Sequence, residues 1–448
     1  MTISASDRLV NMVDHENAFD LPLADVLPGQ LAAVNERFQT RVQKIKLLQH
    51  RAEEGRVREV RRIEDIVPLL FAHTVYKSYP EAWLLEKKWD RLGKWLDTVS
   101  TARVKPMDTG AVRDLDDWLH RLEEQDHYVS CSSGTTGKCA MMNATTFDLQ
   151  YAGRAFLHGL LWAGLKFNKD RMMITCGQFP TSPRNIATGG PMSEALTDPT
   201  LTPFQANAPP ITIGSITEMI MLRKKIADGT ASVADIQYYE AKAVARTMSA
   251  ISVIEQAADA IIANRGRKLH IIGFLGAMYQ VAALVRERGY SGKDFAENST
   301  FLTGGLKGAQ LPDNYREIIF DTLNLTPDRT FGAYGMQELN TNAMRCRAGR
   351  YHLAPWVMLL LLNESGEEQI PMPASGEIEG RAAFFDLSLD GRWGGIISGD
   401  KIRVTCEPCA CGHRSPSIHS DIQRYADMAS GDKISCAGTI DAYVRGVT

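Results

Sequence analysis

The sequence contains no apolar run long enough to cross a membrane. Its most apolar stretch, WVMLLLLN at 356–363, is less than half of the ~20 residues that a spanning helix needs. The N-terminal segment is acidic and polar and lacks the apolar stretch of a signal peptide. Acidic and basic residues nearly balance, with a formal net charge of -3, which argues against nucleic-acid and membrane partners. These absences predict a cytoplasmic protein.

Internal repeats, low-complexity tracts and long linkers are also lacking. The 448 residues exceed one ordinary core, so we expect a large multi-lobed unit or two domains. Eight cysteines are present, and disulfides are not expected in a reducing compartment. Three of the eight fall within CEPCAC at 406–411, which suggests a metal site before a disulfide framework.

Hydrophobic periodicity predicts an α/β core. Helices and short apolar strands alternate from residue 145 onward, an order typical of a sheet with crossover helices. The expected strands span 171–177, 268–274, 299–305 and 329–335, and the expected helices span 147–165, 246–266, 277–289 and 312–324. After about residue 350 strands are joined by turns without long helices, which predicts a β-rich subdomain.

The segment 29–62 has helical periodicity and many charges. A basic amphipathic binding face is one interpretation. A solvated surface helix is the other, and we favour it because charge runs on helices usually face water.

The stretch YVSCSSGTTGKCAM at 128–141 has the composition of a phosphate-binding loop. Its glycines allow close backbone approach, successive N–H groups can form an anion nest, and its lysine adds a positive charge. The residues concerned are Ser132, Ser133, Gly134, Thr135, Thr136, Gly137 and Lys138. A Walker loop requires four residues between its glycines, whereas two separate these, so a P-loop nucleotidase is disfavoured.

Four motifs in order resemble those of the acyl-adenylate-forming (AMP-binding) superfamily. They are SSGTTGK, TGGLKG at 303–308, FGAYGMQEL at 331–339 and SGDKIRV at 398–404. The phenylacetate-CoA ligases are the most similar branch, and the resemblance covers roughly residues 60–448. It implies a large, multi-lobed adenylate-forming N-terminal domain with α/β sheets and a β-rich subdomain.

This resemblance implies four parts of the chain. Residues 1–120 form a mainly helical part, 121–350 an α/β nucleotide-binding core and 351–425 the β-rich subdomain. Residues 426–448 form a hinge and a remnant of a C-terminal lid, with Asp427 near the hinge. The lid's lysine has no match, which leaves open a shortened chain, completion by a separate protein, or adenylation without a full lid.

The resemblance also implies residue roles. The phosphate loop would surround the β- and γ-phosphates of ATP, and Gly304 and Gly305 would flank adenine. Tyr334 would stack on adenine, and Asp400 and Arg424 would lie at the ribose.

The implied catalytic residues are Lys138, Gln337 and Glu338, and Glu338 would also help to hold Mg²⁺. Gln337 departs from the family, which usually has threonine there, and its longer amide would reshape the pocket.

The implied reaction joins a carboxylic acid to AMP and releases pyrophosphate. Family likeness favours an aromatic acid, and the acceptor of the acyl group is CoA or another thiol, an amine or a partner protein. A catalytically idle nucleotide-binding subunit is the alternative, and a homodimer stays open. No covalent protein nucleophile is required, because the enzyme positions reactants and stabilises charge.

Two further segments predict a structural zinc site. MRCRAGRYH places Cys346 six positions before His352, and CEPCACGH supplies Cys409 and Cys411. Two short ligand pairs from separate segments are a common solution for tetrahedral zinc. Some phenylacetate-CoA-ligase-like proteins have pairs at these places. Cys406 is a spare ligand, and unrelated cysteines are the alternative interpretation.

Overall fold

The computed structural model describes residues 3–132, 138–306, 309–429, 431–432 and 434. The chain divides into two compact units, one made of Met1–Gly159 with Tyr334–Thr448 and the other of Leu160–Ala333. The predicted α/β class is confirmed, and the four-part division of the sequence stays a prediction. Among the described residues, no helix combines the length and apolarity that crossing a bilayer requires.

The second unit is built on a parallel sheet. Its strands are β4 (Met172–Cys176), β5 (Leu269–Phe274), β6 (Thr300–Gly304) and β7 (Thr330–Tyr334), in the order β7-β6-β5-β4. Neighbouring strands follow one another in sequence, so right-handed crossovers place their helices on one face. The helices that pack there are α10 (Val233–Ala263), α11 (Leu275–Glu287) and α12 (Tyr315–Leu323).

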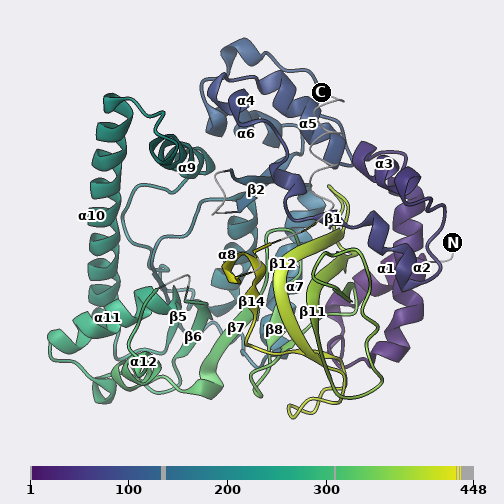
Figure 1. The fold of residues 1–448 in the computed structure, drawn as a ribbon. Helices are drawn as coiled ribbons and strands as arrows, with labels where there is room; N and C mark the ends of the chain where they lie inside the picture. The colour runs from purple at the N-terminus through teal and green to yellow at the C-terminus, as the bar shows by residue number, and fades with distance from the viewer. Residues whose placement is uncertain (1–2, 133–137, 307–308, 430, 433, 435–448) are drawn as a thin grey trace. The chain divides into compact units, whose positions relative to one another are not determined.

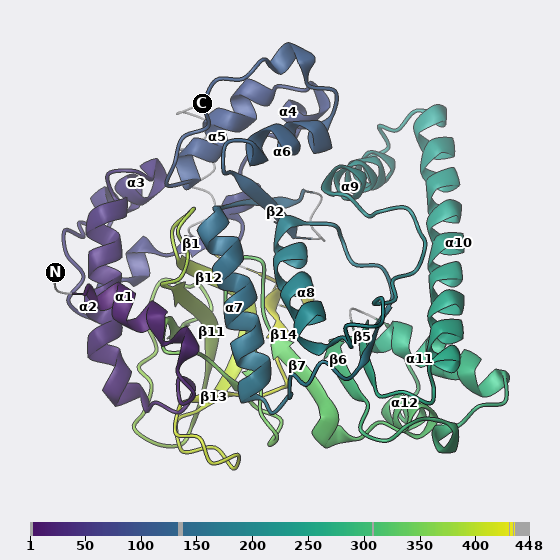
Figure 2. The same ribbon diagram turned by 180° about the vertical axis from the view of Figure 1, so that it is seen from behind.

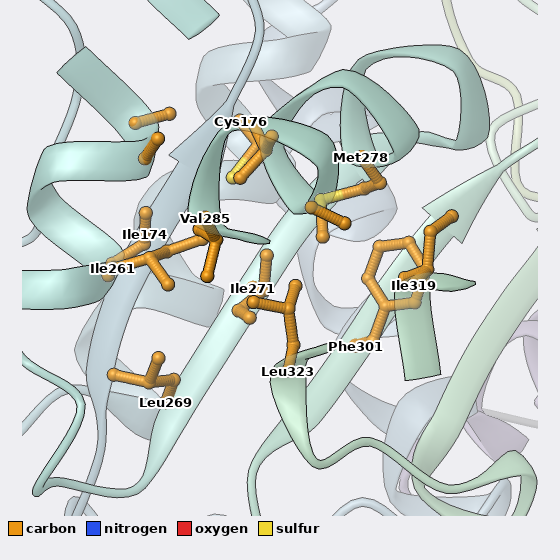
Figure 3. Packing of buried hydrophobic residues seen from close by; sticks show 14 of the residues in the cluster. Ile174, Cys176, Ile261, Leu269, Ile271, Met278, Val285, Phe301, Ile319 and Leu323 are labelled. Atoms are coloured by element: carbon orange, nitrogen blue, oxygen red, sulfur yellow. The ribbon is translucent and has the colours of Figure 1, made fainter. Parts of the chain in front are cut away.

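Apolar side chains from these strands and helices form one core (Figure 3). Ile174, Ile271 and Phe301 are contributed by the strands and are fully buried. Ile261 and Val285 pack onto them from α10 and α11. The near-continuous apolar strands are typical of a parallel sheet covered by helices.

The predicted strands of this region are confirmed, while two predicted helix boundaries are wrong. The helix expected from residue 246 begins at Val233, where Ser232 and Asp235 form a reciprocal capping box. The helix expected from Pro312 begins at Tyr315. The helix expected over 147–165 is confirmed as α7 (Thr146–Trp162). The structure adds two helices that were not predicted from the sequence, α8 (Pro183–Leu196) and α9 (Ile213–Ala227).

The first unit contains the predicted β-rich region. Its antiparallel strands follow the order β10-β11-β12-β13-β9-β8. β14 also pairs antiparallel with β12, whereas β1 pairs with β12 in parallel. The bounds of these strands are β10 (Val357–Leu362), β11 (Glu377–Asp386), β12 (Gly395–Thr405), β13 (Ser417–Ile418), β9 (Tyr351–His352), β8 (Ala343–Arg345), β1 (Phe71–Ala72) and β14 (Gln423–Arg424). A separate hairpin joins β2 (Tyr128–Ser132) to β3 (Ala140–Ala144).

Six helices form the N-terminal part of this unit (Figures 1 and 2). They are α1 (Ala5–Val10), α2 (Leu23–Arg41), α3 (Lys46–Glu54), α4 (Glu81–Leu85), α5 (Trp89–Val99) and α6 (Leu115–Glu123). The single helix expected over 29–62 is therefore wrong. The break falls at Ile45, which has an extended backbone and is fully buried, so the chain turns there to continue the core.

Candidate active site and metal centre

The predicted phosphate loop connects the two strands of the β2–β3 hairpin. Ser132 pairs with Ala140 at the end of the ladder, so the loop leaves and re-enters adjacent strands. The side chain of Ser132 lies outside the described residues, as do five whole residues of the loop: Ser133, Gly134, Thr135, Thr136 and Gly137. Their phosphate-binding role stays a prediction.

Tyr79 anchors the chain where it leaves this loop. The ammonium of Lys138 donates to the Tyr79 carbonyl at 2.8 Å and lies 5.4 Å from the centre of the Tyr79 ring. The Tyr79 hydroxyl donates to the carbonyl of Cys139 at 2.7 Å. Lys138 therefore has a defined position at the base of the loop, with its charge half-buried.

Three of the predicted nucleotide residues lie together. Asp400 in β12 pairs with Arg424 in β14, and Tyr334 ends β7. The Tyr334 hydroxyl donates to Oδ2 of Asp400 at 2.7 Å, and Nε of Arg424 lies 3.8 Å from Oδ1. Burial and the Asp400 carboxylate raise the pKa of Tyr334 well above its usual value, so its hydroxyl keeps the proton that it donates.

The loop that carries Gln337 and Glu338 is held by a residue that the sequence did not indicate. Arg392 is buried and donates to the carbonyls of both residues at 3.1 Å. Its other terminal nitrogen donates to the Asn143 carbonyl in β3 at 2.6 Å. One guanidinium thus fixes this loop to the strand that follows the phosphate loop.

Asp148 supports the same arrangement from the first turn of α7. Its fully buried carboxylate accepts from the backbone N–H of Asp390 at 2.6 Å, of Gly391 at 2.8 Å and of Thr145 at 2.9 Å. The side-chain amide of Asn340 donates to it at 3.1 Å. A Cβ atom at Gly391 would lie 2.9 Å from this carboxylate and 3.0 Å from the Ala144 backbone, so the approach requires glycine.

Gln337 and Glu338, whose carbonyls Arg392 holds, are half-buried. The Oε1 atom of Gln337 is buried and has no hydrogen-bond donor within the part of the chain that the structure describes. Burial lowers the pKa of Lys77, and the Glu338 carboxylate opposes that shift, so Glu338 lies near a cation. A buried acceptor and a carboxylate are suitable partners for a polar ligand and a hard metal ion.

Gly304 is the last residue of β6 in the second unit, and Gly305 follows the strand. A Cβ atom at Gly304 would collide with the Phe274 ring, whereas one at Gly305 would meet nothing within 4 Å. Close packing therefore explains the first glycine. The adenine-binding role of both stays a prediction.

The four predicted zinc ligands lie together in the first unit. The ligand atoms of Cys346, His352, Cys409 and Cys411 are all within 4.8 Å of one another, and all four residues are buried. Sγ of Cys346 lies 3.9 Å from Sγ of Cys409, and Sγ of Cys411 lies 3.5 Å from Nε2 of His352. Ligands bound tetrahedrally to one zinc ion lie roughly 3.5–3.8 Å apart, so the donor set and spacing fit this metal.

Two tight turns carry the three cysteines. Gly349 donates to the Cys346 carbonyl at 2.9 Å and Gly412 donates to the Cys409 carbonyl at 2.8 Å. Both glycines have positive φ, 80° and 99°, a conformation that other residues adopt at a cost. The two turns curl the chain so that each cysteine faces the shared centre.

A hydrogen-bond chain orients the histidine. Nδ1 of His352 lies 2.8 Å from the Ser415 hydroxyl, which donates to the Phe19 carbonyl at 2.6 Å. The Ser415 oxygen therefore accepts a hydrogen bond from Nδ1–H, so Nε2 is the nitrogen that would bind a metal ion. Burial lowers the pKa of His352 to about 4, so the ring is neutral at pH 7. Sequence spacing suggested the ligands but not this link to the N-terminal segment.

Metal analysis tests this centre. Wild-type protein is expected to contain about one zinc per chain, and Cys409→Ser is expected to lose most of it, because a four-ligand site loses one of its thiolates. Cys406→Ser is the matched control, since Cys406 is not a member of the buried group. Equal zinc content in wild type and Cys409→Ser would rule out this ligand set.

No protein-family model matches the chain, and no curated protein matches it in sequence. Solved structures do match. A crystal structure of 2-hydroxyisobutyryl-CoA ligase in the postadenylation state has a TM-score of 0.58 and 13% identity, over 96% of this chain and 76% of that chain. The same enzyme with 2-HIB-AMP and CoA in the thioesterification state has a TM-score of 0.58 and 14% identity, over 92% and 71%. The chain therefore has the fold of an adenylate-forming CoA ligase.

Proposed function

We propose that this chain is an acid-activating, AMP-forming ligase of the cytoplasm. It would use ATP to convert a carboxylic acid into an acyl-adenylate and pass the acyl group to an acceptor. The observation that carries the proposal is the Tyr334–Asp400–Arg424 group. It matches two motifs of the adenylate-forming superfamily, and it lies in a chain with the fold of a CoA ligase.

Each proposed step uses groups of the chain. The loop from Ser132 to Lys138 would hold the β- and γ-phosphates through its N–H groups and its ammonium. Tyr334 would pack on adenine while its hydroxyl holds Asp400, whose carboxylate would accept from the ribose hydroxyls. A carboxylate oxygen of the acid then attacks the α-phosphorus, the bond to the β-phosphate breaks, and pyrophosphate leaves.

Two polar groups would act at the reacting centre. The Gln337 amide would donate to the α-phosphate or to the acyl carbonyl. Glu338 would help to bind Mg²⁺, which supplies neutralisation of phosphate charge. Arg392 holds both carbonyls of this pair and would keep their side chains at fixed positions during the reaction.

We favour an aromatic acid, as in the phenylacetate-CoA ligase-like branch that the motifs resemble. Phe179 lies 5.2 Å from Phe274, ring centre to ring centre, and such a pair offers an apolar surface to an aromatic substrate. CoA is the acceptor that the fold relative uses, and another thiol, an amine or a partner protein are alternatives.

A catalytically idle nucleotide-binding subunit is the second candidate. Gln337 favours it, because the superfamily usually has threonine at this position. ATP binding without formation of AMP, measured by calorimetry and chromatography over a panel of acids, would support this candidate.

Exchange of labelled pyrophosphate into ATP tests the leading proposal. We expect exchange that depends on one class among aromatic, amino and fatty acids, because formation of the acyl-adenylate is reversible. An absence of exchange with every acid, from protein that binds ATP, would reject acid activation.

A further inference from the structure

A fully buried arginine contacts the chain where it continues beyond β14. Arg381 in β11 is 0% exposed. Its Nη1 atom lies 2.9 Å from Oδ1 of Asp432, and its guanidinium carbon lies 3.9 Å from the centre of the Tyr425 ring. Tyr425 and Asp432 both follow β14, so the chain beyond that strand is held against β11 at two points.

The same guanidinium holds the strand that carries Asp400. Nη1 of Arg381 donates to the Ser398 carbonyl at 3.0 Å, and Nε donates to the Glu364 carbonyl at 2.9 Å. The Nη2 atom is buried and has no hydrogen-bond acceptor among the residues that the structure describes. A cation this deeply buried depends on a counter-charge, which the Asp432 carboxylate supplies.

The Asp400 segment is a bulge in the sheet. The register of β11 on β12 shifts between Arg381 and Ala383, so three residues of β12, 398–400, oppose Ala382 alone. Bulged residues are not positioned by the regular ladder between two strands. Two other hydrogen bonds fix this bulge to β11, from Arg381 to the Ser398 carbonyl and from the Ser398 hydroxyl to the Ala382 carbonyl at 2.8 Å.

Asp432 also lies directly against the bulge. A Cβ atom at Gly399 would lie 3.2 Å from Oδ2 of Asp432 and 3.4 Å from the His73 ring. The carboxylate is therefore close to the backbone of the residue that precedes Asp400. Nε2 of His73 lies 3.4 Å from the same carboxylate oxygen. Burial lowers the pKa of His73, which leaves its ring neutral at pH 7 and makes Arg381 the cation that faces Asp432.

We propose that Asp432 is a positioning residue of the nucleotide site. Its carboxylate neutralises Arg381, Arg381 holds the bulge at 398–400, and the bulge sets where the Asp400 carboxylate meets the ribose hydroxyls. The inference rests on the proposed function, which assigns the ribose to Asp400. Linkage is reciprocal, so bound ATP and the docked Asp432 stabilise each other. Asp432→Asn leaves the buried cation without its counter-charge, so the guanidinium moves toward other acceptors and the bulge moves with it.

Calorimetry with two nucleotides in the presence of Mg²⁺ tests this coupling. Asp432→Asn is expected to raise the dissociation constant of ATP roughly fivefold, the value of about one hydrogen bond, because the ribose contacts of Asp400 are misplaced. The dissociation constant of 2′,3′-dideoxy-ATP, which lacks both ribose hydroxyls, is expected to change less than about twofold. Asp421→Asn is the matched control, since this exposed carboxylate pairs with Arg403, and both constants are expected to stay within about twofold of wild type.

Two further variants separate positioning from general damage. Asp432→Glu keeps the charge and is expected to bind ATP more tightly than Asp432→Asn. In an Asp400→Asn background, Asp432→Asn is expected to change the dissociation constant of ATP less than about twofold, because the two carboxylates act as one unit.

Equal weakening of ATP and dideoxy-ATP by Asp432→Asn would indicate a general structural role and overturn the proposal, and so would unchanged binding of ATP. A wild type that does not bind ATP would reject the nucleotide site and this inference with it. The binding measurement does not require pyrophosphate exchange, so it decides the coupling even in a protein that binds ATP without activating an acid.

Discussion

Truncation of Arg392 to alanine is expected to lower the free energy of unfolding by about 3 kcal/mol or more, because it removes a buried charge with several acceptors. The guanidinium donates to carbonyls in β3 and in the Gln337–Glu338 loop, at 2.6 Å and 3.1 Å. Its removal takes a donor from each of these carbonyls, and Asn143 is a buried residue, so an acceptor that loses its partner there adds to the cost of the lost hydrogen bonds. Urea denaturation followed by circular dichroism measures the change.

Arg403→Ala is the matched control for this substitution. Arg403 also lies in the first unit, but its side chain is 36% exposed and pairs with Glu377 and Asp421 at 3.5 Å and 2.6 Å. Exposed pairs of this kind contribute about 1 kcal/mol or less. If the two substitutions lower the free energy of unfolding equally, the hydrogen bonds of Arg392 do not stabilise the contact between the Gln337–Glu338 loop and β3.

Replacement of Asp400 by asparagine is expected to lower kcat/KM for ATP in pyrophosphate exchange by roughly a hundredfold, which corresponds to about 2.7 kcal/mol. This expectation follows from the proposed role of Asp400, because its carboxylate would form charge-assisted hydrogen bonds with the ribose and a neutral amide oxygen is a weaker acceptor. The hydrogen bond from Tyr334, at 2.7 Å, holds the carboxylate ready for that contact. Initial rates at varied ATP concentration give the ratio.

Two controls separate this role from general damage. Tyr334→Phe removes one hydroxyl and keeps the ring, so we expect a loss of roughly threefold to tenfold, the value of one ordinary hydrogen bond. Asp421→Asn changes an exposed carboxylate that pairs with Arg403, and it is expected to leave the exchange rate unchanged. An Asp400→Asn variant with wild-type kcat/KM would remove Asp400 from the nucleotide site.

Local pattern predicted much of the fold because buried parallel strands have a strong local signal. The apolar runs around Ile174 and Ile271 became β4 and β5. Hydrophobic periodicity failed to predict helix ends that are decided by burial in the tertiary structure. Ile45 interrupts a charged helical pattern because its side chain is needed in the core, and no periodicity within 29–62 marks that position.

The residues of the candidate site also include some that could be predicted from local sequence and some that could not. The grouping of Cys346, His352, Cys409 and Cys411 was predictable, because metal ligands often come in short pairs and both pairs are visible in the sequence. Arg392 was not predictable, because its acceptors in β3 and in the motif loop are far away in sequence.

The buried carboxylate of Asp148 was missed for the same reason. Its partners Asp390 and Gly391 lie more than 240 residues later, and no local pattern links such distant positions. Gln337 was visible as a departure from the superfamily motif. The lack of a hydrogen-bond donor to its Oε1 atom, among the residues that the structure describes, emerges only from the folded arrangement.

Transfer of heavy oxygen tests acid activation most directly. The acid identified by the exchange screen, labelled with heavy oxygen in its carboxylate, is incubated with ATP, Mg²⁺ and hydroxylamine as a substitute acceptor, and AMP is analysed by mass spectrometry. Attack of the carboxylate on the α-phosphorus places one labelled oxygen in AMP when the acyl group leaves, and the account predicts that label. AMP without label, or label in phosphate or pyrophosphate, would contradict it.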